Sequence, residues 1–292
     1  MNSKEYFRPI IDNFYSTLTN ISPILNTQIR YLRINKKFAN LKNPKTFSEK
    51  ISWLKLYKYR FDPLIKKCAD KWLVREYLKE CGLENLLNDV YKIYKTPEEI
   101  DWQNLPDKFV LKWNFGSGYN YICTDKNKID ICQVTAILKN WQNKKYWLLY
   151  SEFQYKVDCK YILCERYLQV PGDKELLDYK FYCFNGEPKA VLVISRKDSD
   201  KKKAVFMDLN WKIISDVKNK YKYTFKPDRP KSLTEMIKAA QTLSKPFPFL
   251  RVDFYECNGK PIFGEMTFTP AAGILPAETL INGKDMGELI NI

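Results

Sequence analysis

The strongest constraint on the fold is a change in the spacing of apolar residues near residue 108. Before this point apolar positions recur with the 3.6-residue period of helices, and after it they alternate with the two-residue period of strands. Asn185-Gly186 and Asn258-Gly259 separate later runs, and such dipeptides favour tight hairpins between antiparallel strands. The sequence therefore predicts an α+β fold, with helices first and antiparallel strands later.

Local signals place the expected elements. Ser22-Pro23 divides residues 5–40 into two helical stretches, because proline disfavours helical backbone at the residue before it. Residues 46–49, Thr-Phe-Ser-Glu, form a capping-box pattern that starts another helix, and Asp70 and Gly82 mark the start and end of the next. The other expected elements are a helical turn at 96–99, helices at 129–148 and 232–244, and strands at 108–113, 119–124, 161–168, 178–184, 188–195, 203–209, 249–257 and 261–269.

Composition excludes several kinds of chemistry. The 292 residues include no histidine, which excludes Ser-His-Asp and Cys-His catalysis and histidine-ligated zinc. The eight cysteines contain no C-x-x-C pair, so zinc-ribbon and thioredoxin-like sites are not expected. The formal charge of +15 favours an anionic partner, which could be a nucleic acid, a nucleotide, anionic lipid headgroups or an acidic glycan.

The positive charge is concentrated in one segment. Residues 196–231 contain 12 basic and 5 acidic residues. A groove for an acidic polymer or a membrane surface would explain this excess, and so would an ordinary solvated face. No segment approaches 18 consecutive apolar residues, and the first residues lack the apolar stretch of a signal peptide, so we expect a cytoplasmic protein.

The last predicted hairpin carries the residues best suited to chemistry. Arg251 and Asp253 alternate with apolar residues on one strand, and Glu265 and Thr267 lie together in the same way on the partner strand. Two carboxylates beside an arginine make an oxygen-ligand site for Mg²⁺ carrying a phosphate. The alternative is a solvated strand face with ordinary cross-strand charge pairs.

Strand register decides whether the two carboxylates share a face. A two-residue turn at Asn258-Gly259 would place Asp253 opposite Gly264 and send Glu265 to the other face. The shared metal site therefore requires an odd-length loop or a bulge near Asn258.

Two earlier segments also suggest an anion or nucleotide site. Lys112 stands in an apolar strand, where its burial is costly unless it meets an anion, and the glycines of residues 116–118 would let backbone N–H groups approach a phosphate. The acid, aromatic and lysine residues of 165–168 and 178–180 could line a purine and ribose site. A plain hairpin turn and an edge strand with polar residues outward are the respective alternatives.

The order of these features is that of an ATP-grasp domain. Over roughly residues 43–290 the chain resembles the TupA-like ATP-grasp family, which is named for teichuronopeptide synthesis and found in gene clusters for bacterial cell-surface polysaccharides. The segments that carry the resemblance are 43–54, 70–77, 105–112, 178–186, 206–211 and 264–268.

The resemblance implies an ATP-grasp fold in which two α+β subdomains clasp ATP. A helical N-terminal extension would occupy residues 1–42 and the ATP-grasp domain residues 43–292. Within that domain, 106–165 would form a lid-like subdomain and 166–292 a C-terminal subdomain with the metal site.

The resemblance also implies roles for individual residues in binding ATP. Lys71 and Lys112 would meet the phosphates beneath a lid turn, and Glu165 would form the adenine-binding hinge. The turn consists of Gly116, Ser117 and Gly118; the hinge includes the backbone near Tyr167 and Leu168; and Asp178 and Lys180 would lie near the ribose or the phosphates.

At the reacting end, Arg251 would contact the γ-phosphate. Asp253 and Glu265 would be the Mg²⁺ ligands. Thr267 stands where many ATP-grasp enzymes have asparagine, and it is a weaker ligand.

The implied activity is that of an ATP- and Mg²⁺-dependent carboxylate–amine ligase that forms an acyl phosphate. The expected partners are a uronic-acid carboxylate of an acidic glycan or its precursor and an amino-acid amine, with Arg196 as the candidate for holding the substrate carboxylate or the acyl phosphate. Peripheral contact with membrane-bound polysaccharide machinery at the inner face of the membrane stays open. The alternatives are a glycosyltransferase or glycan kinase of a polysaccharide cluster, and a non-catalytic basic anion-binding protein; no nucleic-acid partner is expected.

Overall fold

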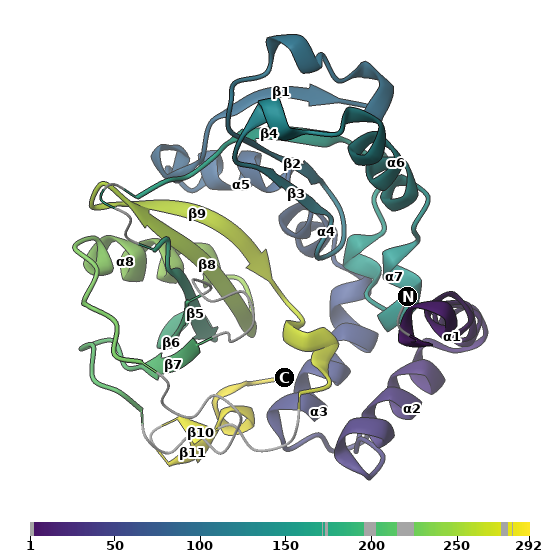
Figure 1. Cartoon of the computed structure of the whole chain (residues 1–292). Helices are drawn as coiled ribbons and strands as arrows, with labels where there is room; N and C mark the ends of the chain where they lie inside the picture. Colours follow the sequence, from purple (N-terminus) through teal and green to yellow (C-terminus); the bar gives the residue numbers. More distant parts are fainter. Residues whose placement is uncertain are drawn as a thin grey trace.

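Two antiparallel sheets organise the molecule (Figure 1). The computed structural model describes residues 3–170, 172, 175–195, 203–214, 225–275, 280–281 and 283–292. The first sheet has the order β1-β4-β2-β3, with β1 (Val90–Tyr94), β2 (Phe109–Trp113), β3 (Asn120–Cys123) and β4 (Ile162–Arg166). The second has the order β7-β6-β5-β8-β9, with β5 (Asp178–Phe184), β6 (Glu187–Ser195), β7 (Lys203–Met207), β8 (Phe249–Cys257) and β9 (Lys260–Thr267). A short pair comprises β10 (Leu280–Ile281) and β11 (Lys284–Asp285).

Helices precede, connect and cover these sheets. The α-helices are α1 (Ser3–Ile21), α2 (Pro23–Asn35), α3 (Phe47–Trp53), α4 (Pro63–Ala69), α5 (Val74–Glu80), α6 (Ile131–Gln142), α7 (Tyr146–Tyr150) and α8 (Leu233–Ser244). A π-helical turn at Leu54–Lys58 extends α3, and 3₁₀ turns occupy Tyr59–Phe61, Glu84–Leu86, Pro97–Glu99, Trp102–Asn104, Lys126–Lys128, Phe153–Tyr155, Pro270–Gly273 and Met286–Leu289. None of the helices in the described part of the chain is long and apolar enough to cross a membrane.

The predicted starts of the first helices are confirmed. Ser22 separates α1 from α2, and its side-chain oxygen accepts a hydrogen bond from the backbone N–H of Leu25 at 3.2 Å. Thr46 and Glu49 form the complete capping box at the start of α3. Each side chain satisfies a backbone N–H that would otherwise lack a partner at the helix end.

The structure contains α4 and the short β10–β11 pair, which were not predicted, and it differs from the expected elements in two further places. The expected helical region at 129–148 is two helices, because the chain turns between α6 and α7 and the N–H of Lys144 bonds back to the carbonyl of Trp141 at 3.0 Å. Strand β1 was not predicted. Only Tyr94 of its five residues is buried. Buried and exposed residues therefore do not alternate along β1, and the alternation of apolar and polar residues that identifies a half-buried strand is missing.

Each sheet has its own apolar core. The larger core joins the second sheet to α3, α4, α5 and α8, and it contains Phe181, Phe249 and Phe254. The smaller core joins the first sheet to α6 around Trp113, which is fully buried and donates its indole N–H to the carbonyl of Leu138 at 3.2 Å. Two separate cores define two α+β units, which confirms the predicted fold class.

A β-bulge sets the register of the last hairpin. Near the Asn258-Gly259 turn Phe254 pairs with Phe263, as a two-residue turn requires, but Asp253 pairs with Glu265. Gly264 is therefore the extra residue of the bulge. The shared metal site required an odd-length loop or a bulge near Asn258, and the structure has a bulge, at Gly264.

Gly264 is the residue type that this bulge requires. A Cβ atom there would lie 3.0 Å from the backbone oxygen of Asp253 and 3.3 Å from the ring of Tyr255, closer than side-chain carbons normally approach. The absence of a side chain lets the two strands change register without separating.

Replacing Gly264 with alanine should therefore destabilise the protein by about 1–3 kcal/mol through overpacking. Denaturant unfolding monitored by tryptophan fluorescence measures the loss. Lys260→Ala, at an exposed position of the same strand, is the control and should leave stability unchanged. An unaltered unfolding midpoint in Gly264→Ala would contradict this account of the bulge.

Candidate active site

A cleft of about 590 Å³ lies between the two sheets. Its size falls within the range of small-molecule sites. The first sheet contributes Val110, Lys112, Asn120, Ile122, Glu165 and Arg166, and the second contributes Asp178, Lys180, Asp253, Tyr255, Phe263, Gly264 and Glu265. The remaining lining residues are Lys71, Val74, Arg75, Leu87, Asn88, Ser117, Gly118, Tyr167, Leu168 and Leu176.

One lysine and three carboxylates lie across the second sheet at the floor of this cleft. Lys180 of β5 pairs directly with Asp253 of β8 and forms ion pairs with both Asp253 and Asp178, the latter at 2.8 Å. Asp253 in turn pairs with Glu265 of β9. The register of three adjacent strands therefore brings these four groups to one face of the sheet.

Arg251 joins the two carboxylates of β8 and β9. Its Nε and one terminal nitrogen each donate to a carboxylate oxygen of Asp253 at 2.7 Å. The same terminal nitrogen lies 3.0 Å from Oε1 of Glu265 and 2.9 Å from the hydroxyl of Thr267, which itself hydrogen-bonds Glu265 at 3.0 Å. A planar guanidinium suits this fork of oxygens.

The two carboxylates have opposite pKa shifts. Burial raises the pKa of Asp253 from 3.8 to about 6, although Arg251 and Lys180 lower it. Burial would also raise the pKa of Glu265, but Arg251, Lys180 and Lys71 outweigh it and lower that pKa to about 2. The side chain of Glu265 is 43% exposed and that of Asp253 only 3%, so Glu265 faces the cleft more openly.

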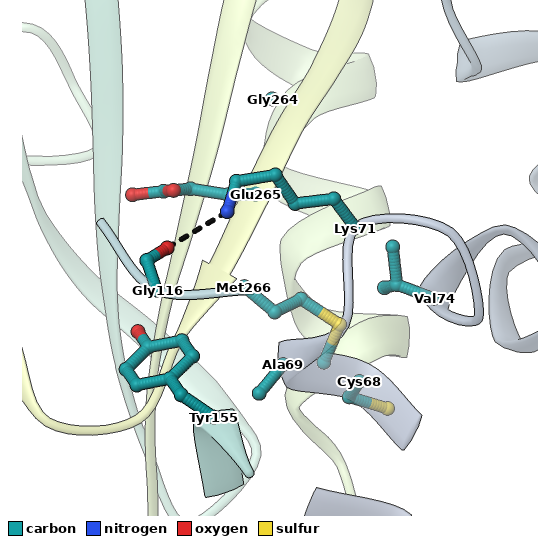
Figure 2. A pocket seen from close by; sticks show the side chains of 9 residues that line it. All are labelled: Cys68, Ala69, Lys71, Val74, Gly116, Tyr155, Gly264, Glu265 and Met266. Atoms are coloured by element: carbon teal, nitrogen blue, oxygen red, sulfur yellow. Dashed lines mark hydrogen bonds between the residues drawn. The ribbon is translucent and has the colours of Figure 1, made fainter. Parts of the chain in front are cut away.

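Lys71 reaches the lid turn from the segment before α5. Its ammonium donates to the carbonyl oxygen of Gly116 at 2.8 Å (Figure 2). It also lies 3.5 Å from the carbonyl oxygen of Phe115. Gly116 has a φ of +66° and packs against the ring of Tyr146, where an added Cβ would lie 2.9 Å from the ring carbon Cγ. Burial lowers the pKa of Lys71, and the Glu265 charge partly offsets this.

Asp70 and Asn114 hold Lys71 in this position, a role that no local sequence pattern indicates. The carboxylate of Asp70 accepts the backbone N–H groups of Trp72 and Leu73 at 2.7 and 3.1 Å in the turn before α5, and also the side-chain amide of Asn114 at 2.6 Å. Asp70 was predicted to cap this helix, but α5 begins at Val74 and its N-cap residue is Leu73. The backbone carbonyl of Asn114 accepts the N–H of Lys71 at 2.9 Å. The buried polar pair thus fastens the Lys71 segment to the end of β2.

Lys112 and Glu165 form an ion pair of 2.6 Å on the opposite wall of the cleft. Lys112 lies on β2 and Glu165 on the adjacent β4. Asn88 was not among the predicted site residues. Its side-chain amide donates to the backbone oxygen of Arg166 at 2.9 Å, beside Glu165. An asparagine in a short loop has no sequence pattern that distinguishes this role from an ordinary turn.

The structure thus gathers most of the sequence-predicted site residues around one cleft. Gly116 lines a small recess next to it, together with Lys71, Glu265 and Tyr155 (Figure 2). Arg251 and Thr267 contact the cleft residues Asp253 and Glu265 from the adjacent positions on β8 and β9. Arg196 lies outside the described residues, as does much of the basic segment 196–231.

The floor of the cleft fits a magnesium ion that is shared with phosphates. Mg²⁺ usually keeps several waters and binds one or two protein carboxylates together with substrate phosphates. Asp253 and Glu265 supply two carboxylates on one face, and Lys71 and Lys112 line the same cleft. Among the described residues no group of three or more His, Cys, Asp or Glu side chains could hold a metal ion, so a donor set of two carboxylates suits an ion that is shared with phosphates.

The two α+β units, with a phosphate-suited cleft between their sheets, define an ATP-grasp fold. A family model described as TupA-like ATPgrasp matches residues 49–287. The chain therefore belongs to the TupA-like ATP-grasp family, as its sequence motifs predict. None of the curated proteins matches it.

Several solved structures are similar to the chain at low identity. D-alanine–D-alanine ligase from Bacillus anthracis complexed with ATP is 17% identical, with a TM-score of 0.42 over 69% of this chain and 55% of that one. N5-carboxyaminoimidazole synthase from Aspergillus clavatus, in complex with ADP and its ribonucleotide, is 13% identical, with a TM-score of 0.41 over 70% and 44%. An ADP complex of N5-carboxyaminoimidazole ribonucleotide synthetase is 12% identical, with a TM-score of 0.45 over 81% and 52%. The chain spans about half the length of these proteins.

The raised pKa of Asp253 predicts a pH-dependent metal site. Above pH 6 the carboxylate is ionised, and below it the group takes up a proton and loses its attraction for a cation. Stabilisation by ATP that requires Mg²⁺ should therefore weaken as the pH falls through about 6.

Thermal unfolding with ATP, in the presence and absence of Mg²⁺ at each pH, measures this dependence. The variant Asp253→Asn, compared with its own ligand-free midpoint, should show no Mg²⁺-dependent stabilisation at any pH. A wild-type response that stays constant well below pH 6 would contradict the assignment.

Proposed function

We propose that the protein is an ATP-dependent carboxylate–amine ligase that modifies a bacterial cell-surface polysaccharide or its precursor. The observation that carries the proposal is the pairing of Asp253 with Glu265 around Arg251, in the cleft that Lys71 and Lys112 also line. Membership in the TupA-like family supports the polysaccharide context, because that family is found in gene clusters for cell-surface polysaccharides.

The proposed reaction depends more on neutralising the negative charge of the phosphates than on proton transfer by a side chain. A substrate carboxylate oxygen attacks the γ-phosphorus of ATP, the bond to the leaving oxygen breaks, and ADP and an acyl phosphate result. An amine then attacks the acyl carbon, phosphate leaves, and the amine loses a proton to form the amide. Mg²⁺, when bound, would neutralise phosphate charge.

The side chains of the cleft match these steps without histidine. Lys71 and Lys112 would bind the phosphates of ATP, and Arg251 would stabilise the negative charge that develops on the transferred phosphoryl group. Asp178 and Lys180 would position the ribose or the phosphates. On the other wall, Glu165 with the backbone near Tyr167 and Leu168 would hold the adenine.

Lys112 offers the clearest test of phosphate binding. Lys112→Ala should lower ATP-dependent turnover by about 100- to 1,000-fold, because it removes a charge that stabilises the transition state. Its fold should survive, since Lys112 and Glu165 remain partly open to solvent with side chains 23% and 11% exposed. Lys108→Ala, which removes an exposed lysine just before the same strand, is the matched control and should retain turnover. ADP release by Lys112→Ala at the wild-type rate would contradict the proposal.

Arg251 is expected to serve structure as well as turnover. Arg251→Ala should abolish turnover and should also lower the free energy of unfolding by about 3–5 kcal/mol, because it removes a partner of the buried Asp253. Chemical denaturation beside the turnover assay separates the two effects.

The substrate class is tested by product analysis. Incubation with ATP, Mg²⁺, a uronic-acid donor and a panel of amino-acid amines should yield a product heavier than the donor by the amine less one water. Mass spectrometry measures this, with Lys112→Ala as the inactive control. A phosphorylated sugar without an amide would identify a glycan kinase instead.

A further inference from the structure

Helix α1 turns a polar side toward the rest of the protein and an apolar side away from it. Apolar residues recur along α1 at Ile10, Phe14, Leu18 and Ile21, which is the spacing of an amphipathic helix. In a soluble domain such a stripe normally packs against the core. Here Ile10 is 62% exposed, Phe14 52% and Ile21 72%.

Hydrogen bonds and an arginine fix this orientation from the inner side. The hydroxyl of Thr19 donates to the carbonyl of Leu148 in α7 at 2.6 Å, and the amide of Asn26 in α2 donates to the carbonyl of Leu149 at 3.2 Å. The guanidinium of Arg30 stacks between the rings of Tyr15 and Tyr150, at 3.5 and 4.1 Å from their centroids. Turning α1 over would leave these buried polar groups unpaired, so the apolar stripe stays outward.

The second helix and the segment after it extend this exposed surface. We call it the N-terminal apolar surface. It consists of Ile10, Ile11, Phe14, Ile21, Ile24, Leu25, Leu32, Ile34 and Phe38, all of them exposed. Figure 1 shows α1 and α2 at the edge of the molecule that lies away from the second sheet. A surface of this kind requires a partner that accepts apolar side chains.

The charge beside this surface is mostly positive, and Asp12 of α1 is an acidic exception. Residues 13–48 contain six basic residues and no aspartate or glutamate. Arg30 packs against aromatic rings, whereas the other five are exposed, and within the described part of the chain none of these five pairs with a carboxylate. The five are Arg33, Lys36, Lys37, Lys42 and Lys45.

We propose that the N-terminal apolar surface and these five basic side chains dock the protein on an anionic lipid membrane. Apolar side chains on an amphipathic helix enter the boundary between headgroups and acyl chains, and neighbouring lysines and arginines are attracted to anionic headgroups. A second copy of this chain fits less well. In a two-fold symmetric contact the same basic surface would face itself, and Asp12 would offset only part of its positive charge.

Vesicle co-sedimentation of the full chain without nucleotide tests this docking independently of catalysis. Wild-type protein should bind vesicles of phosphatidylcholine with phosphatidylglycerol at least about tenfold more tightly than vesicles of phosphatidylcholine alone, and added salt should weaken binding. Lys112→Ala should bind vesicles like the wild type, whatever its turnover. Equal binding to both vesicle types, or none to either, would overturn the proposal.

Paired variants separate the apolar and charged contributions. Ile10→Ser with Phe14→Ser, and separately Lys36→Glu with Lys37→Glu, should each weaken binding to the anionic vesicles by about tenfold or more. Phe61→Ser replaces a phenylalanine that is 71% exposed elsewhere, and it should bind like the wild type. Lys92→Glu with Lys95→Glu makes the same change of net charge at exposed lysines of the β1 region, and it should have a smaller effect than the Lys36 and Lys37 variant.

Two outcomes of these variants would count against the membrane. If Ile10→Ser with Phe14→Ser binds vesicles as the wild type does, the apolar surface is not the docking site. If light scattering shows a wild-type dimer that this variant dissociates, while vesicles bind neither protein, the surface is an interface between copies of the chain.

Discussion

The candidate site depends on one electrostatic contact, the fork of hydrogen bonds between Arg251 and the carboxylates of Asp253 and Glu265. Asp253 is almost fully buried, and an ionised carboxylate at such depth is costly unless cations compensate it. Arg251 and Lys180 supply that compensation from the same strand and from the neighbouring one. Because both cations are tied to Asp253, the charged face is held in place before any ligand arrives, which is what efficient electrostatic stabilisation requires.

The contact exists only because the two strands change register once. In a hairpin without the bulge, Gly264 would pair with Asp253, and Glu265 would point to the opposite face of the sheet. The glycine therefore contributes to the site through the alignment of β8 and β9, although it has no side chain of its own in the cleft. Its position decides which charged side chains can meet there.

Much of this arrangement could be read from the sequence, and the limits have physical causes. The capping box at Thr46, the break at Ser22 and the hairpin turn at Asn258 are local signals, and the structure contains all three. The sequence indicated that the shared site needs an odd-length loop or a bulge, but not that the bulge lies at Gly264, since any position along a hairpin can absorb an extra residue. Asp70, Asn114 and Asn88 support the site through long-range hydrogen bonds, which no local spacing encodes. The domain boundaries stay predictions, as does the role of Arg196.

The hydrogen bonds from Lys71 to residues 115 and 116 leave part of its ammonium group available. An ammonium group carries three N–H bonds, and the carbonyl oxygens of Gly116 and Phe115 can use at most two of them. One hydrogen is left for an anion in the cleft, so a phosphate could be held without first releasing the turn. The same nitrogen would then join the anion to the backbone of Phe115 and Gly116, and its bonds to that backbone would persist after the anion leaves.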